Sequence, residues 1–386
     1  MEKVTQDPGD PTFVQNPYPV YDRMRDLGDL IWWEAYGMVV SPSYKATAAI
    51  LKDRRFGREP VDPIPVPAHL TDFYGVEAHS MLELEPPRHT RLRGLVTRAF
   101  TSRRVAALAP EIEALCQELI DAFPEGPFDL LPAYCTPVPV RIIARMLGVP
   151  EAEAPQLLAW SHAMVGMYQA SRTHAMEVAA NDAARAFTDW VSDLITARRR
   201  SPGEDLMSAL IAAEEDGARL NREELITTVI LLLNAGHEAT VHTLGNGVKT
   251  LLETGHRDIT PGLVEEVLRF DPPLHVFTRI AREEVELFGH RFAPGETIGC
   301  LLAAANRDPA FASGPHRFDP ARQIKGQNMA FGAGLHFCVG APLARLEIEI
   351  ALRVLFDRCP ALRLTTPPRY APIYHFHGLE TLEVAR

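Results

Sequence analysis

The strongest constraint on this chain is a glycine-rich loop that runs directly into an apolar helix. Three glycines interrupt residues 331–340, and glycine allows backbone conformations and close approaches that a Cβ would obstruct. Residues 341–355 repeat apolar side chains at helical spacing, with Pro342 tolerated in the first turn. Cys338 lies just before this helix, where the helix dipole favours a thiolate. The segment predicts one thiolate presented to a metal, and a buried structural cysteine in an ordinary turn is the alternative.

Composition predicts a large globular protein. Its 386 residues are 46% hydrophobic, and we expect a single domain over residues 1–386. The net charge of -11 disfavours nucleic acid as a partner. Five cysteines without CxxC spacing argue against a zinc site and a disulfide framework, which indicates a reducing, cytoplasmic setting. We expect no signal peptide and no membrane span, because the longest apolar run, around 225–235, is short and interrupted.

Hydrophobic spacing predicts a mainly α fold with two small sheets. Apolar residues recur at helical intervals from 91 to about 200. Asn221 with Glu224 predicts a helix start, and the helix that follows is apolar on nearly all faces, as expected of a buried central helix. The proline-rich stretch 60–87 is expected to be a long ordered loop. Strands are predicted at 38–40, 284–287 and 297–302.

An acidic residue interrupts the predicted central helix. The sequence at 235–240 is AGHEAT, which places Glu238 where packing would prefer leucine. Burying a carboxylate is unfavourable unless it is paired. We interpret Glu238 as functional, with a polar neighbour on another helix as the alternative.

Two further motifs carry little information alone. Glu266 and Arg269 are spaced i and i+3, so they share a helix face and can pair, as surface residues often do. Six arginines lie between residues 88 and 104, and they form either a solvated helix face or an anion site.

Together, and in this order, the motifs resemble those of the cytochrome P450 family, specifically its soluble bacterial members. The resemblance extends over nearly the whole chain and rests chiefly on the pattern F-G-x-G-x-H-x-C-x-G at 331–340. It implies a cytochrome P450 fold with haem b between the central helix near Gly236 and the helix after the cysteine loop. Cys338 would then be the thiolate ligand of the haem iron, which favours O–O cleavage.

The resemblance also implies roles for the other motifs. Glu266 and Arg269, joined by Arg322, would form a buried network that holds the cysteine loop. Residues of the AGHEAT segment match the part of the family's central helix where a local break leaves room for dioxygen. The side chains implied to bind the haem propionates are His89, Arg93, Arg279 and His336. The remaining implied cofactor contacts are Ala235, Phe331, Gly332, Cys338 and Gly340.

The acid segment departs from the family pattern. The family usually has threonine directly after the acid, where its hydroxyl helps to deliver protons, whereas this chain has Ala239 and then Thr240. One helical residue is a rotation of about 100°, so Thr240 is not an automatic substitute. Proton delivery is expected to use Glu238, ordered water or a substrate hydroxyl. The expected catalytic positions are Gly236, Glu238, Ala239 and Thr240.

The resemblance implies a haem-thiolate monooxygenase that inserts one atom of O2 into a small to medium, mostly apolar organic substrate. No flavin or nicotinamide motif is present, so electrons would come from a separate ferredoxin or flavodoxin, and an acidic carrier would suit the arginines at 88–104. We expect a monomer that binds neither nucleic acid nor membrane.

Three alternatives stay open. The missing threonine suits a haem-thiolate peroxygenase or isomerase. A non-catalytic haem sensor or carrier would need neither Glu238 nor a substrate pocket. A hydrolase using Cys338 with His336 is disfavoured, because residues two apart in a loop rarely reach the orientation that a nucleophile and its base require.

The substrate itself is not identified by the sequence. The resemblance implies a mostly apolar pocket, and each of its positions is alternatively simply part of the core. His275 and His377 are possible polar anchors for the substrate. The implied pocket positions are Phe73, Tyr74, Met81, Met164, Leu232, Leu274, Val276, Phe277 and Phe376, together with Ala235.

Overall fold

The computed structural model describes residues 1–169, 172–213, 220–374 and 376–386, and its contacts divide the chain into two compact units. The chain enters each unit more than once, so neither is a contiguous segment. The first unit comprises residues 1–62, 112–136 and 239–386, and the second comprises 63–111 and 137–238. The expectation of one domain over residues 1–386 stays a prediction.

The described part of the second unit is built from helices and short helical turns, as the spacing from 91 to about 200 predicts. Its helices are α4 (Thr71–Glu77), α5 (Arg88–Ala99), α6 (Ser102–Ala107), α8 (Pro137–Leu147), α9 (Ala154–Val165), α10 (His174–Arg200), α11 (Leu206–Ala213) and α12 (Arg222–Ala235). Its 3₁₀ turns are η1 (Ala68–Leu70), η3 (Glu151–Glu153) and η4 (Gly166–Tyr168).

Helix α12 is the predicted buried helix, and its start is confirmed. The side chain of Asn221 accepts a hydrogen bond from the backbone N–H of Glu224, and the Glu224 carboxylate accepts one from the N–H of Asn221. This reciprocal pair satisfies two amide donors that a helix start leaves without partners. Residues from Glu224 to Ile230 are buried without a break, so this part of the helix exposes little surface to solvent.

The first unit contains the main sheet, whose strand order is β1-β2-β3-β9-β6-β4. Strands β3 and β9 pair in parallel, whereas β9 and β6 pair antiparallel, with Arg279 opposite Ile298 and Phe277 opposite Cys300. The strands of this sheet are β1 (Lys3–Val4), β2 (Ile31–Trp33), β3 (Met38–Ser41), β4 (Phe56–Gly57), β6 (Val276–Ala281) and β9 (Thr297–Leu301).

Smaller sheets and a hairpin complete the β structure of this unit. The order β10-β13-β5 forms a three-stranded sheet, while β11 pairs with β12 and β7 with β8. Their bounds are β5 (Phe128–Asp129), β7 (Val285–Leu287), β8 (His290–Phe292), β10 (Arg363–Leu364), β11 (Arg369–Tyr370), β12 (Leu379–Thr381) and β13 (Glu383–Ala385).

The helices of the first unit are assigned to it by most of their residues. They are α1 (Pro11–Gln15), α2 (Tyr18–Leu27), α3 (Tyr44–Lys52), α7 (Ala109–Asp121), α13 (Glu238–Thr254), α14 (Pro261–Phe270), α15 (Leu302–Asn306) and α16 (Ala341–Arg358). Helices α3 and α15 pack against strands of the main sheet. A π-helical turn, η2 (Leu131–Cys135), and two 3₁₀ turns, η6 (Met329–Phe331) and η7 (Gly334–His336), connect them. None of the described helices combines the length and apolar character that crossing a bilayer requires.

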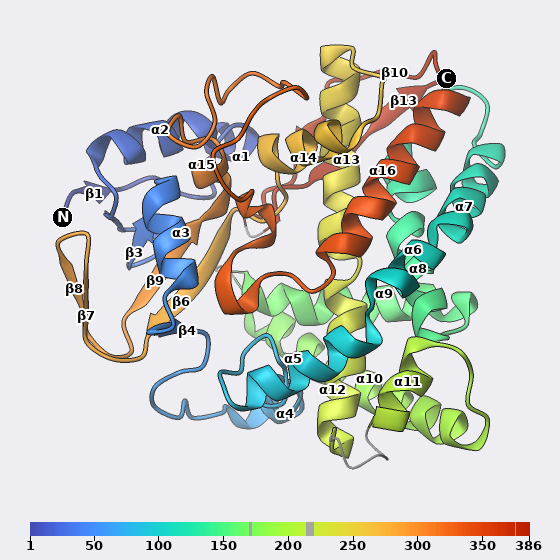
Figure 1. Cartoon of the computed structure of the whole chain (residues 1–386), viewed down its shortest axis with the longest axis horizontal. Helices are drawn as coiled ribbons and strands as arrows, with labels where there is room; N and C mark the ends of the chain where they lie inside the picture. Colours follow the sequence, from blue (N-terminus) through green and yellow to red (C-terminus); the bar gives the residue numbers. More distant parts are fainter. Residues whose placement is uncertain (170–171, 214–219, 375) are drawn as a thin grey trace. The chain divides into compact units, whose positions relative to one another are not determined.

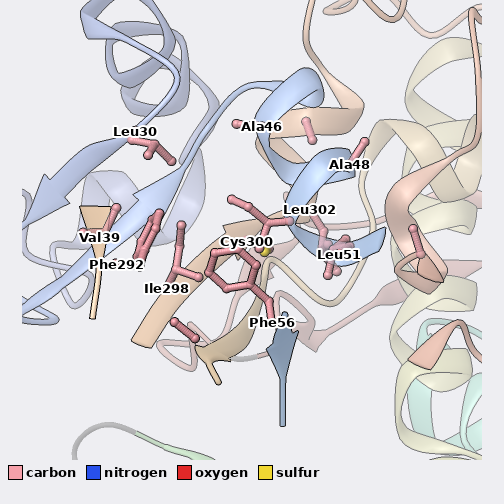
Figure 2. Packing of buried hydrophobic residues seen from close by; sticks show 14 of the residues in the cluster. Leu30, Val39, Ala46, Ala48, Leu51, Phe56, Phe292, Ile298, Cys300 and Leu302 are labelled. Atoms are coloured by element: carbon pink, nitrogen blue, oxygen red, sulfur yellow. The ribbon is translucent and has the colours of Figure 1, made fainter. Parts of the chain in front are cut away.

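An apolar core joins α3 to the main sheet. Ala46, Ile50 and Leu51 of α3 are buried in one cluster with residues of strands β3 and β9 (Figures 1 and 2). Ser43 caps α3 by accepting a hydrogen bond from the N–H of Ala46. The cluster includes Met329 and Ala333, so this core reaches the segment that carries the cysteine loop.

The mainly α fold with small sheets is confirmed, and two local predictions need correction. The stretch 60–87 is not loop throughout, because η1 and α4 form within it. Leu302 begins α15 and does not extend strand β9.

Candidate functional site

The cysteine loop, residues 331–340, runs from the end of η6 to the start of α16 and contains η7. Gly332 and Gly334 both have left-handed backbone angles, with φ of 68° and 73°. A Cβ on Gly334 would collide with the carbonyl oxygen of Leu51, so only glycine lets the loop approach α3 this closely. The N–H of Cys338 donates to the carbonyl of Phe331 at 3.1 Å, which closes the loop. The sequence therefore fixes the backbone on both sides of the sulfur.

The thiol of Cys338 differs from the four other cysteines in its environment. Cys338 is exposed, whereas the others are buried. Burial raises the pKa of Cys116 and of Cys300 to about 11, and it also raises the pKa of Cys135 and Cys359. Those four thiols stay protonated at neutral pH and are unsuited to bind a metal. An exposed sulfur just before a helix start fits the thiolate ligand of a haem iron.

A buried ion pair lies on α14. The guanidinium of Arg269 donates to the Glu266 carboxylate twice, from Nε to Oε2 at 2.7 Å and from Nη2 to Oε1 at 2.8 Å. Both side chains are almost fully buried, with 1% and 3% of their surface exposed. The carboxylate also accepts from Arg322 Nε at 3.3 Å and from the N–H of Asp319 at 2.8 Å. Sequence spacing placed the pair on one face, and the structure brings Arg322 to it.

Asn306 connects this network to the cysteine loop. Arg269 Nη1 donates to the backbone carbonyl of Asn306 at 3.1 Å, and Asn306 Oδ1 accepts from the N–H of Met329 at 2.7 Å. Met329 begins η6, the turn that ends at Phe331 and leads into the loop. Asn306 is fully buried, so both contacts are shielded from water. Sequence reasoning missed this residue because an isolated asparagine in an apolar run carries no distinguishing spacing.

The acid segment, residues 235–240, contains a break between two helices. Helix α12 ends at Ala235 and α13 begins at Glu238, with Gly236 and His237 between them. A Cβ on Gly236 would collide with the carbonyl oxygen of Leu232 and lie 2.8 Å from Ile143 Cγ1. His237 Nδ1 donates to the carbonyl of Leu233 at 2.7 Å, which satisfies an acceptor at the helix end.

Glu238 contacts two histidines. His162 Nε2, on α9, lies 3.2 Å from Glu238 Oε2, and His237 Nε2 lies 3.4 Å from the same oxygen. The hydrogen bond to Glu238 raises the pKa of His162. His162 is exposed, while the carboxylate is largely buried. Sequence analysis anticipated a polar neighbour on another helix but not its identity, because the two residues are far apart in the chain.

The two positions after the acid differ in burial. Thr240 is 6% exposed in the first turn of α13, and Ala239 is half-buried. The carbonyl of Ala239 accepts a hydrogen bond from Thr243 Oγ1 at 2.7 Å. No hydroxyl is attached to the residue that directly follows Glu238, so the departure seen in the sequence is not compensated at that position.

The implied propionate-binding residues come from both units. In the second unit, His89 is buried and Arg93 half-buried on α5. In the first unit, Arg279 is 3% exposed on β6 and donates from Nη1 to the carbonyl of Thr278 at 2.8 Å, while His336 is half-buried in η7. The Arg279 guanidinium is buried enough that an anionic group beside it would be favourable. Phe331 and Gly340 bound the cysteine loop, and Ala235 is exposed at the end of α12.

The implied substrate positions also divide between the units. In the second unit, Phe73, Met81, Met164 and Leu232 are buried and Tyr74 is half-buried. In the first unit, Leu274, Val276, Phe277 and Phe376 are half-buried. An isolated β-bridge places Leu274 beside Phe376, and a Cβ on Gly332 would lie 3.1 Å from the Phe277 ring.

His377, one of the two possible polar anchors, belongs to a buried polar cluster. His377 Nδ1 lies 3.2 Å from Asp271 Oδ1, and its Nε2 bonds to the carbonyl of Val14 at 3.1 Å. Tyr18 donates to Asp271 at 2.9 Å, and Tyr370 also donates to this carboxylate. Burial opposes ionisation of Asp271, but His377 and the hydrogen bonds hold its pKa well below the usual range.

His275 lies beside this cluster. Its Nδ1 is 2.8 Å from Tyr21 Oη, and burial lowers its pKa well below the usual value. The ring is fully buried. These contacts explain His377 as an interior group satisfied by its neighbours, whereas the buried Nε2 of His275 has no hydrogen-bond partner among the described residues.

A family profile and individual known proteins both match this chain. Residues 253–368 match the family profile described as Cytochrome P450. The cytochrome P450 monooxygenase PikC of Streptomyces venezuelae is 39% identical over 400 residues, covering 96% of this chain and 91% of the relative. The polyketide biosynthesis cytochrome P450 PksS of Bacillus subtilis is 33% identical and covers 100% of this chain and 99% of the relative.

Solved structures show the same similarity in three dimensions. P450BioI, crystallised in complex with an acyl carrier protein bearing hexadec-9Z-enoic acid, aligns with a TM-score of 0.91 at 33% identity and covers 97% of this chain and 99% of its own. PksS aligns with a TM-score of 0.88 and covers 99% of both chains.

Proposed function

Because the chain belongs to the cytochrome P450 family and is a monooxygenase of that family, we propose that Cys338 binds the iron of haem b and that the substrate is a largely apolar, polyketide-like compound. The observation that carries this proposal is the exposed thiol of Cys338 in a loop fixed by left-handed glycines. A haem with a thiolate ligand supplies the activation of dioxygen, from which one oxygen atom enters the substrate.

The residues of this chain would bind the group and control protons. The loop and Asn306 hold the Cys338 sulfur in one position, and the Glu266–Arg269 pair holds Asn306. Arg279 offers a buried cation for a propionate, and His89, Arg93 and His336 are the other proposed partners. Glu238 holds a proton at Oε2 for delivery during the reaction, a role that suits a carboxylate in contact with histidine.

The proposed substrate class rests on two arguments. The candidate pocket positions are mostly apolar, which favours a ligand with much hydrocarbon surface. One relative, PksS of Bacillus subtilis, is described as a polyketide biosynthesis cytochrome P450. A polyketide-like substrate also carries oxygen atoms, and a substrate hydroxyl would stand in for the hydroxyl that Ala239 lacks. A spectral binding screen with polyketide lactones and fatty acids tests this class directly.

The proposed electron donor is a separate ferredoxin or flavodoxin. Helices α5 and α6 expose Arg88, Arg98 and Arg103, and this basic surface suits an acidic carrier protein. Arg98→Glu should weaken the interaction with an acidic ferredoxin and reduce its dependence on salt. Unchanged reduction kinetics in this variant would remove α5 from the docking surface.

The decisive experiment is the spectrum of the reduced protein with carbon monoxide. Wild-type protein should show the red-shifted Soret band of a thiolate-ligated haem, and Cys338→Ser should lose it. Cys359→Ser is the matched control, because Cys359 is the cysteine at the other end of α16. A Cys338→Ser variant that keeps both its haem and the band would show that Cys338 is not the ligand.

Ala239 favours a second candidate, a haem-thiolate peroxygenase or isomerase. Such an enzyme does not need the proton relay that the family's threonine normally completes. Product formed with hydrogen peroxide at a rate above that obtained with a reductase and ferredoxin would favour this candidate.

A further inference from the structure

His162 links Glu238 to solvent. The His162 side chain is 57% exposed on α9, whereas the Glu238 side chain is 17% exposed at the first position of α13. His162 Nε2 lies 3.2 Å from Glu238 Oε2, so the two groups are in ion-pair contact and close enough for proton transfer once the N–H points at this oxygen. A titratable ring therefore contacts bulk water and, through one nitrogen, a mostly buried carboxylate.

The second histidine in contact with Glu238 has a different function. His237 is buried, and its Nδ1 hydrogen is committed to the carbonyl of Leu233. Its Nε2 lies 3.4 Å from Glu238 Oε2. His237 cannot exchange protons with bulk water as readily as an exposed ring. The geometry makes His162 the solvent-side member of this three-residue cluster.

The charge states suit repeated proton transfer. A carboxylate at the first residue of a helix is stabilised by the helix dipole, which favours the ionised form of Glu238. Contact with Glu238 also raises the pKa of His162, which favours the protonated ring. Both effects favour an imidazolium beside a carboxylate, with the proton on the solvent side.

Resting on the proposed function, we propose that His162 is the residue that reloads Glu238 with protons during turnover. In this step the Nε2–H bond of His162 breaks and an Oε2–H bond forms on Glu238, so the imidazolium becomes a neutral imidazole and the carboxylate becomes a carboxylic acid. Glu238 passes the proton onward and returns to the carboxylate. The exposed ring then takes a replacement proton from water. In this proposal the reloading step limits proton delivery.

A titration of His162 tests the pair without measuring activity. Histidine ring signals of the carbon monoxide-bound ferrous holoenzyme are followed by NMR against pH. The pKa of His162 should be raised in the wild type and should fall toward its ordinary value in Glu238→Gln, which removes the negative charge. An equal His162 pKa in the two proteins would overturn the proposal, because the pair would then be absent in solution.

Turnover of His162→Gln tests the proton role. Glutamine retains a hydrogen-bond donor but does not titrate, so kcat should fall by about tenfold or more with KM unchanged, and released peroxide should rise. The wild-type kcat should decline as pH rises through the His162 pKa, and this decline should be absent in His162→Gln. His290→Gln is the matched control, since His290 forms a comparable pair with Glu296 at 2.8 Å on the β7–β8 hairpin.

The proposed function and the proposed proton role of His162 are refuted by different results. If wild-type protein lacks the thiolate band with carbon monoxide, the proposed function is wrong and the proton role falls with it. If the band is intact but His162→Gln keeps the wild-type kcat, pH profile and product yield per electron, the proton role alone is refuted. A lower melting temperature with unchanged pH profile would likewise refute it, by showing that His162 only ties α9 to the helix break.

Discussion

Removal of the Glu266 carboxylate should destabilise the protein severely. In Glu266→Ala, Arg269 and Arg322 keep side chains that are 1% and 5% exposed but lose their shared anion. Breaking a buried pair by removing one partner costs about 3–5 kcal/mol, because the remaining charge is left uncompensated. Every 1.4 kcal/mol is tenfold, so the folding equilibrium should fall by about 100-fold to 4,000-fold. Arg269→Ala should behave alike, and Arg322→Ala should show the same trend.

The assay is urea unfolding of the purified holoprotein together with its haem content per chain. The variant should unfold at a lower urea concentration and retain less haem, since Asn306 and the turn at Met329 lose their support. Arg353→Ala is the control, because Arg353 pairs with Glu113 at 3.1 Å with 41% of each side chain exposed. An exposed pair contributes about 0–1 kcal/mol. Equal unfolding midpoints in the two variants would refute the reasoning.

Three further outcomes follow from the described contacts. The pKa of Asp271 is depressed in the folded state. The ionised carboxylate should therefore stabilise the protein fully above pH ~4, and this stabilisation should be lost as pH falls below that value. Urea unfolding measured at each pH should show this acid sensitivity in the wild type and not in Asp271→Asn. Gly334→Ala should displace the cysteine loop from Leu51 and reduce haem retention, measured by absorbance, whereas Gly289→Ala, at a turn with open space, should retain haem. Ala239→Thr should change the product formed per electron, and an unchanged ratio would show that a hydroxyl there is not limiting.

Local chemistry was predictable where the sequence itself carries the spacing. The start of α12 at Asn221 and Glu224, the beginning of α16 near Pro342 and the pairing of Glu266 with Arg269 all depend on residues within four positions of one another. Such short-range patterns determine capping and helix faces directly. The mainly α fold with small sheets was confirmed for the same reason.

Contacts between distant segments were beyond sequence reasoning. Asn306, His162 and the polar cluster around Asp271 depend on which elements meet in three dimensions, and neither charge nor hydropathy marks them in the chain. The stretch 60–87 was assigned as loop because its prolines are clustered, yet they precede and follow η1 and α4 without interrupting them. Proline excludes regular structure only at its own position and at its immediate neighbours.

The attachment of the cysteine loop has a consequence for the order of events during synthesis. The loop is positioned by Leu51 near the beginning of the chain, by Asn306 and by Glu266 through Arg269, and α16 follows it. These supports are spread over most of the polypeptide, so a ribosome-bound chain that ends before α16 holds none of them in their final arrangement around Cys338. We therefore expect the cofactor to be captured late, after synthesis of α16, and a truncated chain to be released without it.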